Sequence, residues 1–98
     1  MQNKPAIAQI IELLGKKRVM RIIWELRAAP LTFRQLQAAC DNVSPTLLNA
    51  RIKELIDNNI VCKQPPKGYT LTAAGFEFLE IYQPLKKWAI RWQSSLER

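Results

Sequence analysis

A run of small polar and cationic residues lies between positions 44 and 53 of this sequence. On a helical wheel its apolar residues share one face, and the opposite face presents hydroxyls, an amide, an alanine and a cation: Ser44, Thr46, Asn49, Ala50 and Lys53. Such side chains hydrogen-bond to base edges, and their small size suits a major groove about 12 Å wide. The pattern predicts a helix face that contacts DNA; the alternative is the solvated face of any surface helix.

Four further cations extend this candidate DNA surface. Arg51 lies on the flank of the same predicted helix, where it either reaches a phosphate or braces the helix. Lys63 and Lys67 flank Pro65-Pro66 in a short turn, which suits phosphate contacts, although a solvated turn with ordinary lysines is the alternative. Arg34 completes the predicted set of DNA contacts.

The charge balance favours a polyanionic partner. Fifteen Lys and Arg against eight Asp and Glu give a net charge of +7, which fits DNA, RNA or an anionic membrane surface. No histidine is present, which excludes a Ser-His-Asp triad and His-ligated metal. Without a recognisable acid pair or a Gly-rich phosphate loop, we expect no enzyme, no metal and no cofactor.

The two cysteines indicate core positions rather than chemistry. Cys40 and Cys62 are too few and too far apart for a zinc ribbon or a C-x-x-C pair, so we expect small buried apolar residues with reduced thiols. No apolar run approaches the roughly 20 residues that span a bilayer, and no signal peptide is visible. We therefore expect a cytoplasmic protein with no membrane partner.

Four helices are expected before residue 60, over residues 6–14, 16–28, 33–40 and 45–58. Thr32 is a candidate N-cap of the third, and Ser44-Pro45 is a strong start for the fourth. Asp41-Asn42 indicates a turn between these two helices, and Asn59 stands where a left-handed residue ends a helix. Leu31 is expected to be a short extended link.

A two-stranded hairpin and a last helical region follow. Residues 60–64 and 69–71 predict the strands, and Thr72 is expected to cap a helix that Pro84 kinks or splits. This order predicts a mostly α chain with a small β-hairpin: one winged helix-turn-helix domain over residues 1–98. The helix-turn-helix would span about 32–58 and the wing about 60–71; a generic α+β domain with the same element order is the alternative.

An apolar stripe in the last segment predicts dimerisation. Ile81, Leu85, Trp88, Trp92 and Leu96 recur at intervals of 4, 3, 4 and 4, which is typical of a seam against a partner helix. The alternative is that the stripe packs on the chain's own first helix, whose apolar face holds Ile7, Ile10 and Leu14. Both interpretations are compatible if residues 6–14 and 72–96 of two chains combine in one dimer interface.

Short motifs between residues 7 and 92 follow a characteristic order. They are Leu14-Gly15-Lys16-Lys17, Trp24-Glu25-Leu26, Thr32-Phe33-Arg34-Gln35-Leu36, Val43-Ser44 before Leu48, Arg51-Ile52-Lys53-Glu54-Leu55, Asn59-Ile60-Val61 and Tyr69-Thr70-Leu71-Thr72-Ala73-Ala74-Gly75. Their order and spacing resemble those of HxlR-type winged-helix transcriptional regulators, relatives of the MarR proteins. The resemblance implies a homodimer on operator DNA, with recognition helices in adjacent major grooves and dimerisation through the first and last helices.

Three features depart from that family pattern. Arg18 stands where the family has Trp, and Asn3, Lys4 and Pro5 stand where many members carry a Cys. Thiol or aldehyde sensing through that position is therefore not implied, and no motif identifies another small-molecule effector. The wing is several residues shorter than usual, which weakens the case for minor-groove contact.

The sequence thus predicts a sequence-specific DNA-binding transcriptional regulator, acting as a homodimer on a palindromic operator. A second hypothesis is a winged-helix protein-interaction module whose working surface is the tryptophan stripe. A third is an RNA or membrane-surface binder driven by charge alone. A regulator should protect a short palindrome of fixed spacing, and a protein module should not.

Overall fold

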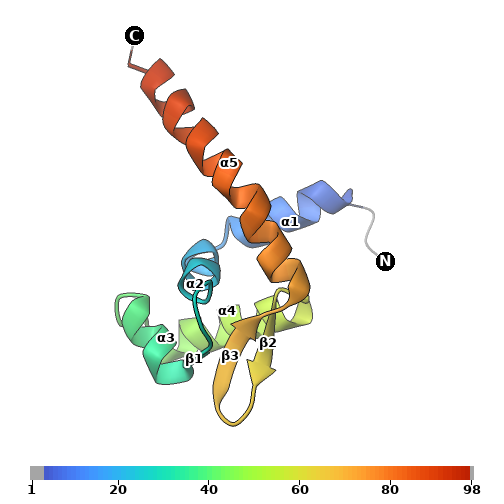
Figure 1. Cartoon of the computed structure of the whole chain (residues 1–98), viewed down its shortest axis with the longest axis vertical. Helices are drawn as coiled ribbons and strands as arrows, with labels where there is room; N and C mark the ends of the chain where they lie inside the picture. The colour runs from blue at the N-terminus through green and yellow to red at the C-terminus, as the bar shows by residue number, and fades with distance from the viewer. Residues whose placement is uncertain (1–3, 98) are drawn as a thin grey trace.

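Residues 4–97 are described by a computed structural model (Figure 1). The helices are α1 (Ala6–Leu14), α2 (Val19–Glu25), α3 (Phe33–Ala39), α4 (Pro45–Asp57) and α5 (Ala73–Ser95). The strands are β1 (Leu31–Thr32), β2 (Val61–Gln64) and β3 (Gly68–Leu71). This order of α2, β1, α3, α4, hairpin and α5 is the winged helix-turn-helix arrangement that the sequence predicts.

The core forms where the apolar stripes of α2, α3 and α4 meet the sheet. Ile22, Ile23, Leu36, Leu48 and Leu55 are fully buried there. Val61 and Leu71, which are paired across the hairpin, close the core from the sheet side. The burial of these residues drives the helix-turn-helix and the hairpin to fold as one unit.

Side-chain caps fix the starts of α3 and α4. Thr32 and Gln35 form a reciprocal capping box at α3, and the Ser44 hydroxyl accepts from the Leu47 N–H at 3.2 Å. Both predicted caps are confirmed, and each satisfies backbone N–H groups that a helix start leaves unpaired. The direction of α4 is thereby set by local sequence.

Left-handed residues make the turns around α4. Asp41 and Asn42, with φ of 61° and 56°, form the turn between α3 and α4, and Asn59 ends α4 with φ 59°. The predicted turn and the predicted left-handed end of the helix are confirmed. Aspartate and asparagine tolerate this backbone region better than other non-glycine residues.

The sheet has three strands rather than the expected two. Strand β3 lies in the middle, paired antiparallel with β2 on one side and with β1 on the other, where Leu31 faces Tyr69. Leu31 is extended, as expected, but its pairing with Tyr69 was not predicted. Two residues are too few to show the alternation of a strand, and their partner is distant in the sequence.

Two helix predictions also need correction. The second helix begins at Val19 instead of residue 16, because Arg18 is left-handed with φ 75° and ends the turn after α1. Pro84 does not split α5, which is continuous from Ala73 to Ser95. Proline removes one backbone N–H, and both Pro84 and the residue four positions earlier are solvent-exposed, so water is available to the freed carbonyl.

The start of α5 is anchored to the end of α4. The Thr72 hydroxyl caps α5 by accepting from the Gly75 N–H at 3.1 Å and donates to the Asn59 carbonyl at 2.7 Å. Gly75 is buried, and a Cβ there would lie 2.5 Å from the Ile60 carbonyl oxygen. Only glycine permits this approach, which sets the base of the wing against α5.

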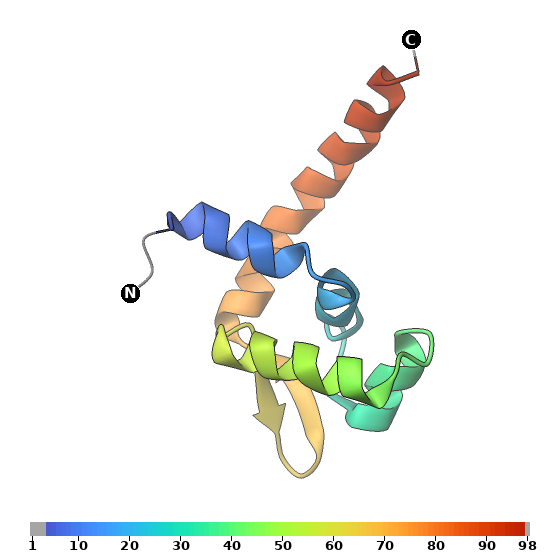
Figure 2. The ribbon, with the colours of Figure 1, turned by 180° about the vertical axis from the view of Figure 1, so that it is seen from behind.

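The molecule has two distinct ends. The C-terminal half of α5 projects away from the body, while the β2–β3 hairpin extends in the opposite direction beside α4 (Figures 1 and 2). The longest dimension is 50 Å. The predicted DNA-contacting elements and the predicted dimerisation stripe therefore lie at opposite ends.

Candidate nucleic-acid interface

The predicted recognition face lies on the outside of α4. Leu48, Ile52 and Leu55 turn inward, and the opposite face presents only exposed side chains in its first half: Ser44, Thr46, Asn49, Ala50 and Lys53. The helical wheel therefore orients α4 as the structure does. Ser44 already uses its hydroxyl oxygen as the cap of α4, while its hydroxyl proton remains a donor.

A groove joins α4 to the hairpin. It has a volume of about 280 Å³ and is lined by Asn49, Ile52, Lys53, Ile56, Lys63 and Tyr69. A second depression of about 390 Å³ runs along the wing from Lys63 through Lys67 to Tyr69, so the two share Lys63 and Tyr69. Helix and wing thus form one continuous surface, and Tyr69 is a member that the sequence reasoning missed.

The two depressions of this surface are lined by cationic side chains and by no acidic residue among those the structure describes. Within residues 4–97, Lys53, Lys63 and Lys67 form no ion pair, whereas other cations of the chain do. Unpaired ammonium groups along a groove attract a polyanion from solution.

Arg51 is partly buried and bonded to the protein itself. Its Nε donates to the Lys17 carbonyl at 3.0 Å, and its Nη1 donates to Glu54 Oε1 at 2.8 Å. The side chain is only 21% exposed. Of the two roles the sequence left open, these contacts are those of a brace that ties α4 to the turn before α2.

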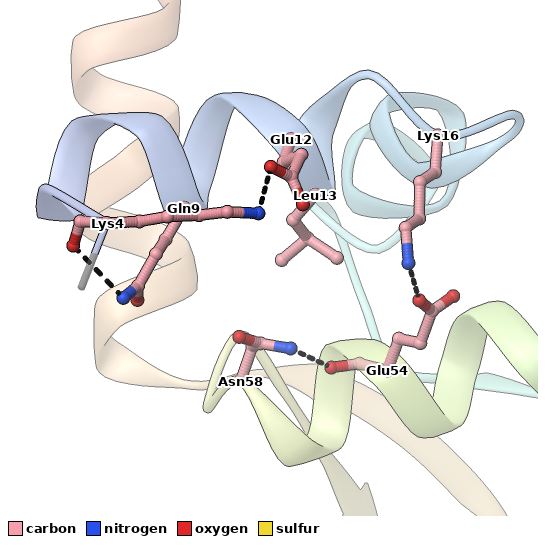
Figure 3. A pocket seen from close by; sticks show the side chains of 7 residues that line it. All are labelled: Lys4, Gln9, Glu12, Leu13, Lys16, Glu54 and Asn58. Atoms are coloured by element: carbon pink, nitrogen blue, oxygen red, sulfur yellow. Dashed lines mark hydrogen bonds and ion pairs between the residues drawn. The ribbon is translucent and has the colours of Figure 1, made fainter. Parts of the chain in front are cut away.

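Glu54 is the centre of that brace. It pairs with Lys16 from the α1–α2 turn (Figure 3). It also pairs with Arg51. The Lys16 ammonium first, and then the Arg51 guanidinium, lower the pKa of the Glu54 carboxyl. The carboxylate thus neutralises two cations near the recognition helix and holds its middle in place.

We predict that Glu54→Gln destabilises the fold at neutral pH by about 1 kcal/mol, the scale of a partly exposed ion pair. Because the folded-state pKa is lowered, the stabilisation exists above the unfolded pKa near 4.3 and disappears as pH falls through the folded pKa. Urea unfolding at pH 7 and pH 3 should show a gap between variant and wild type that closes in acid. The matched change Glu80→Gln, on exposed α5, should show no such pH dependence. A gap as large at pH 3 as at pH 7 would contradict the ionic role of Glu54.

The remaining basic residues are used differently. Arg34 is exposed on α3 but lines neither depression. Arg21 donates to the Ala39 carbonyl at 2.5 Å and lies 3.4 Å from Asp41, which Arg18 also approaches at 3.8 Å. These two arginines hold the α3–α4 turn against α2.

The apolar stripe of α5 is exposed in the single chain. Trp88 and Trp92 are 51% and 50% exposed and stack at 6.2 Å between ring centroids. Ile81, Leu85 and Leu96 are exposed beside them, so the chain's own first helix does not cover the stripe. A monomer rarely leaves so large an apolar surface in water.

Only part of the apolar face of α1 that was expected at the dimer interface is exposed. Ile7 is 68% exposed, as a partner contact requires, whereas Ile10 and Leu14 pack against the chain's own core. Ile11, four residues after Ile7, is the second exposed apolar residue and was missed. The wheel places Ile7, Ile11 and Leu14 close together, but it cannot show which of them meets the core.

The cysteines fit packing positions. Cys40 is fully buried, as predicted, and burial raises the pKa of its thiol, which disfavours the reactive thiolate. Cys62 is half-buried in β2. Among residues 4–97, no cluster of three His, Cys, Asp or Glu side chains is arranged to hold a metal. Asn3, at the site of the family's cysteine, lies outside the described residues.

None of the described helices combines the length and the apolar character that crossing a membrane requires.

Comparison with known proteins agrees with this arrangement. The HxlR-like helix-turn-helix family matches residues 13–97. The HTH-type transcriptional regulator MJ0925 of Methanocaldococcus jannaschii is 33% identical over 90 residues, covering 88% of this chain and 84% of the relative. The HTH-type transcriptional regulator YodB of Bacillus subtilis is also 33% identical, over 91 residues, covering 87% of this chain and 81% of the relative.

Solved structures give the same result. The quinone-bound YodB structure from B. subtilis superimposes with a TM-score of 0.84 at 32% identity, covering 90% of this chain and 98% of that chain. A MarR-family regulator from Enterococcus faecalis V583 shares the fold, with a TM-score of 0.78 at 20% identity over 97% of this chain and 94% of that chain. These relatives are transcriptional regulators and not enzymes. The chain is therefore a helix-turn-helix transcriptional regulator that belongs to the HxlR-like family.

Proposed function

We propose that this regulator binds double-stranded DNA in a sequence-specific manner, as a homodimer on a palindromic operator. The observation that carries the proposal is the continuous surface of α4 and the wing, whose two depressions have no Asp or Glu among the described residues that line them, with Asn49, Lys53 and Lys63 around one groove. The N-terminal half of α4 enters the major groove, where Thr46 and Asn49 contact bases. Lys53, Lys63 and Lys67 contact phosphates, and Arg34 adds charge from α3.

The homodimer is supported by the exposed apolar surface of α5 and α1. The stripe lies at the end of the molecule away from the hairpin, so pairing through it leaves both recognition helices free (Figures 1 and 2). Two linked helices about 34 Å apart then read two half-sites in successive major grooves. In this arrangement Trp88 and Trp92 hold the dimer together, with Ile7 and Ile11 at its edge.

We predict that Lys53→Ala weakens DNA binding several-fold and reduces the slope of log Kd against log salt by about 1, because one phosphate contact is lost. Lys53 is exposed and unpaired within the described residues, so the melting temperature should change little. Fluorescence anisotropy with a labelled duplex at three or more salt concentrations measures both quantities.

The matched control is Lys87→Ala, which removes the same charge from an exposed position on α5. It should leave the slope unchanged. If Lys53→Ala leaves both affinity and slope at the wild-type values, Lys53 is not in the interface.

A protein-interaction module remains the second candidate, because the exposed tryptophan stripe on α5 would suit a different protein as well as a second copy. The two functions separate on DNA binding by the unmodified chain. A module of this kind would bind every duplex only through charge, with no preferred sequence.

A further inference from the structure

Two grooves flank α4, and they differ in charge. The groove between α1 and α4 has a volume of about 380 Å³ and is lined by Lys4 and Lys16 together with Glu12 and Glu54. These side chains form two ion pairs, Lys4 with Glu12 and Lys16 with Glu54, so the positive and negative charges of this groove cancel (Figure 3). The groove between α4 and the wing has Lys53 and Lys63 on its walls and no acid among the described residues that line it, so of the two it is the one that selects for an anion.

The register of the hairpin explains why its base faces α4. Lys63 and Tyr69 are direct cross-strand partners, so their side chains lie on the same face of the hairpin. Val61 and Leu71, two residues further along the strands, share that face and are buried in the core. Lys63 and Tyr69 therefore lie on the core-facing side of the hairpin, beyond its buried part, where they face the recognition helix α4.

The groove combines donors with an apolar wall. Asn49 and Lys53 are four residues apart and enter it from the same face of α4. The Tyr69 hydroxyl has no hydrogen-bond partner within residues 4–97, and the Tyr69 ring is half-buried beside Ile56. A nucleotide backbone matches this set, since its phosphate is anionic and one side of its deoxyribose is apolar.

We propose that this groove holds one backbone phosphodiester of DNA per subunit, an assignment that rests on the proposed function. Lys53 and Lys63 pair with the phosphate, the Tyr69 hydroxyl donates to it, and the sugar lies against the Tyr69 ring. Asn49, at the same groove, then meets the adjacent base edges. The short wing acts through its base, beside α4, and anchors the register of the recognition helix along the duplex.

The test combines variants with single neutralised phosphates. Lys63→Met keeps the aliphatic stem, Lys63→Arg keeps the charge, and Tyr69→Phe keeps the ring; thermal melting confirms that each is folded. Each protein is titrated by anisotropy with a duplex selected from a random pool, and with copies in which one phosphate is replaced by methylphosphonate. The control is Lys87→Met on exposed α5.

At one position in each half-site, the methylphosphonate should weaken wild-type binding about tenfold and weaken Lys63→Met less, because one of the two ion pairs to that phosphate is already broken. Lys63→Met should reduce the salt slope by about 1, and Lys63→Arg should restore it. Tyr69→Phe should weaken binding about tenfold, the scale of one hydrogen bond to a charged group, with no change in slope.

Failure of the groove and failure of the proposed function give different results. If wild type binds a preferred duplex but neither Lys63→Met nor Tyr69→Phe couples to a single phosphate, the phosphodiester assignment is overturned and the DNA-binding function stands. If wild type prefers no duplex sequence, the proposed function fails and the assignment fails with it.

Discussion

Replacing both Trp88 and Trp92 with alanine is expected to weaken dimerisation at least a hundredfold and operator binding with it. Each indole leaves half of its surface exposed in the single chain and would be covered in a dimer. Truncating one buried tryptophan costs about 3–5 kcal/mol, and each 1.4 kcal/mol is tenfold in affinity. Sedimentation velocity over a concentration series measures the shift to monomer, and anisotropy on the same samples measures DNA affinity.

The control for this prediction lies on the same helix. Ile90 is 60% exposed but lies on the opposite face of α5, about 160° from the stripe on a helical wheel. Ile90→Ala should leave the dimer largely intact. If the double tryptophan variant stays dimeric while Ile90→Ala dissociates, the interface lies on the other face of α5, and the assignment of the stripe is wrong.

Replacing Asn49 with alanine is expected to abolish the preference for one base pair in each half-site. The preference that is lost should be about 10–100-fold in affinity over the other base pairs. Asn49 is exposed on the first half of α4, and an asparagine amide makes a paired contact with adenine worth roughly 1–3 kcal/mol. Binding measured against operator variants with each base substituted in turn gives the profile of preference.

Lys53→Ala, one turn further along the same face of α4, provides the comparison. It should weaken all operator variants by a similar factor, since a phosphate contact carries no sequence information. A uniform loss for Asn49→Ala as well would mean that Asn49 only positions the backbone.

The parts of the fold that depend on local sequence could be predicted. Ser44 and Thr72 start helices because their own side chains cap them. Asn59 follows the end of α4 because asparagine tolerates the left-handed backbone that ends a helix. The outward face of α4 followed from its own periodicity. Each of these features is decided within about four residues.

The parts of the fold that depend on contacts between distant residues could not be predicted from the sequence. Leu31 forms a strand only because Tyr69 offers it a free edge, and Arg18 adopts a left-handed backbone that its residue type does not favour. Ile11 remains exposed while Ile10 packs on the core, which depends on how α1 lies against its neighbours.

The residues of the candidate site differ in the same way: some could be identified from local sequence, and others needed the packed structure. Asn49 and Lys53 could be identified from the wheel, and Lys63 from its place beside the turn. Tyr69 could be identified only from the hairpin register and the position of α4, which together open the groove. Arg51 was correctly placed on the flank of α4, but its contacts with Lys17 and Glu54 needed the packed structure.

Selection of bound duplexes from a random pool, at stated salt, tests the central proposal most directly. The proposed homodimer should enrich an inverted repeat whose half-site centres lie about 10 base pairs, or about 34 Å, apart at one fixed spacing. Trp88→Ala combined with Trp92→Ala should lose that spacing. Recovery of no preferred sequence, or of single half-sites with no fixed partner, would contradict dimeric operator recognition by this chain.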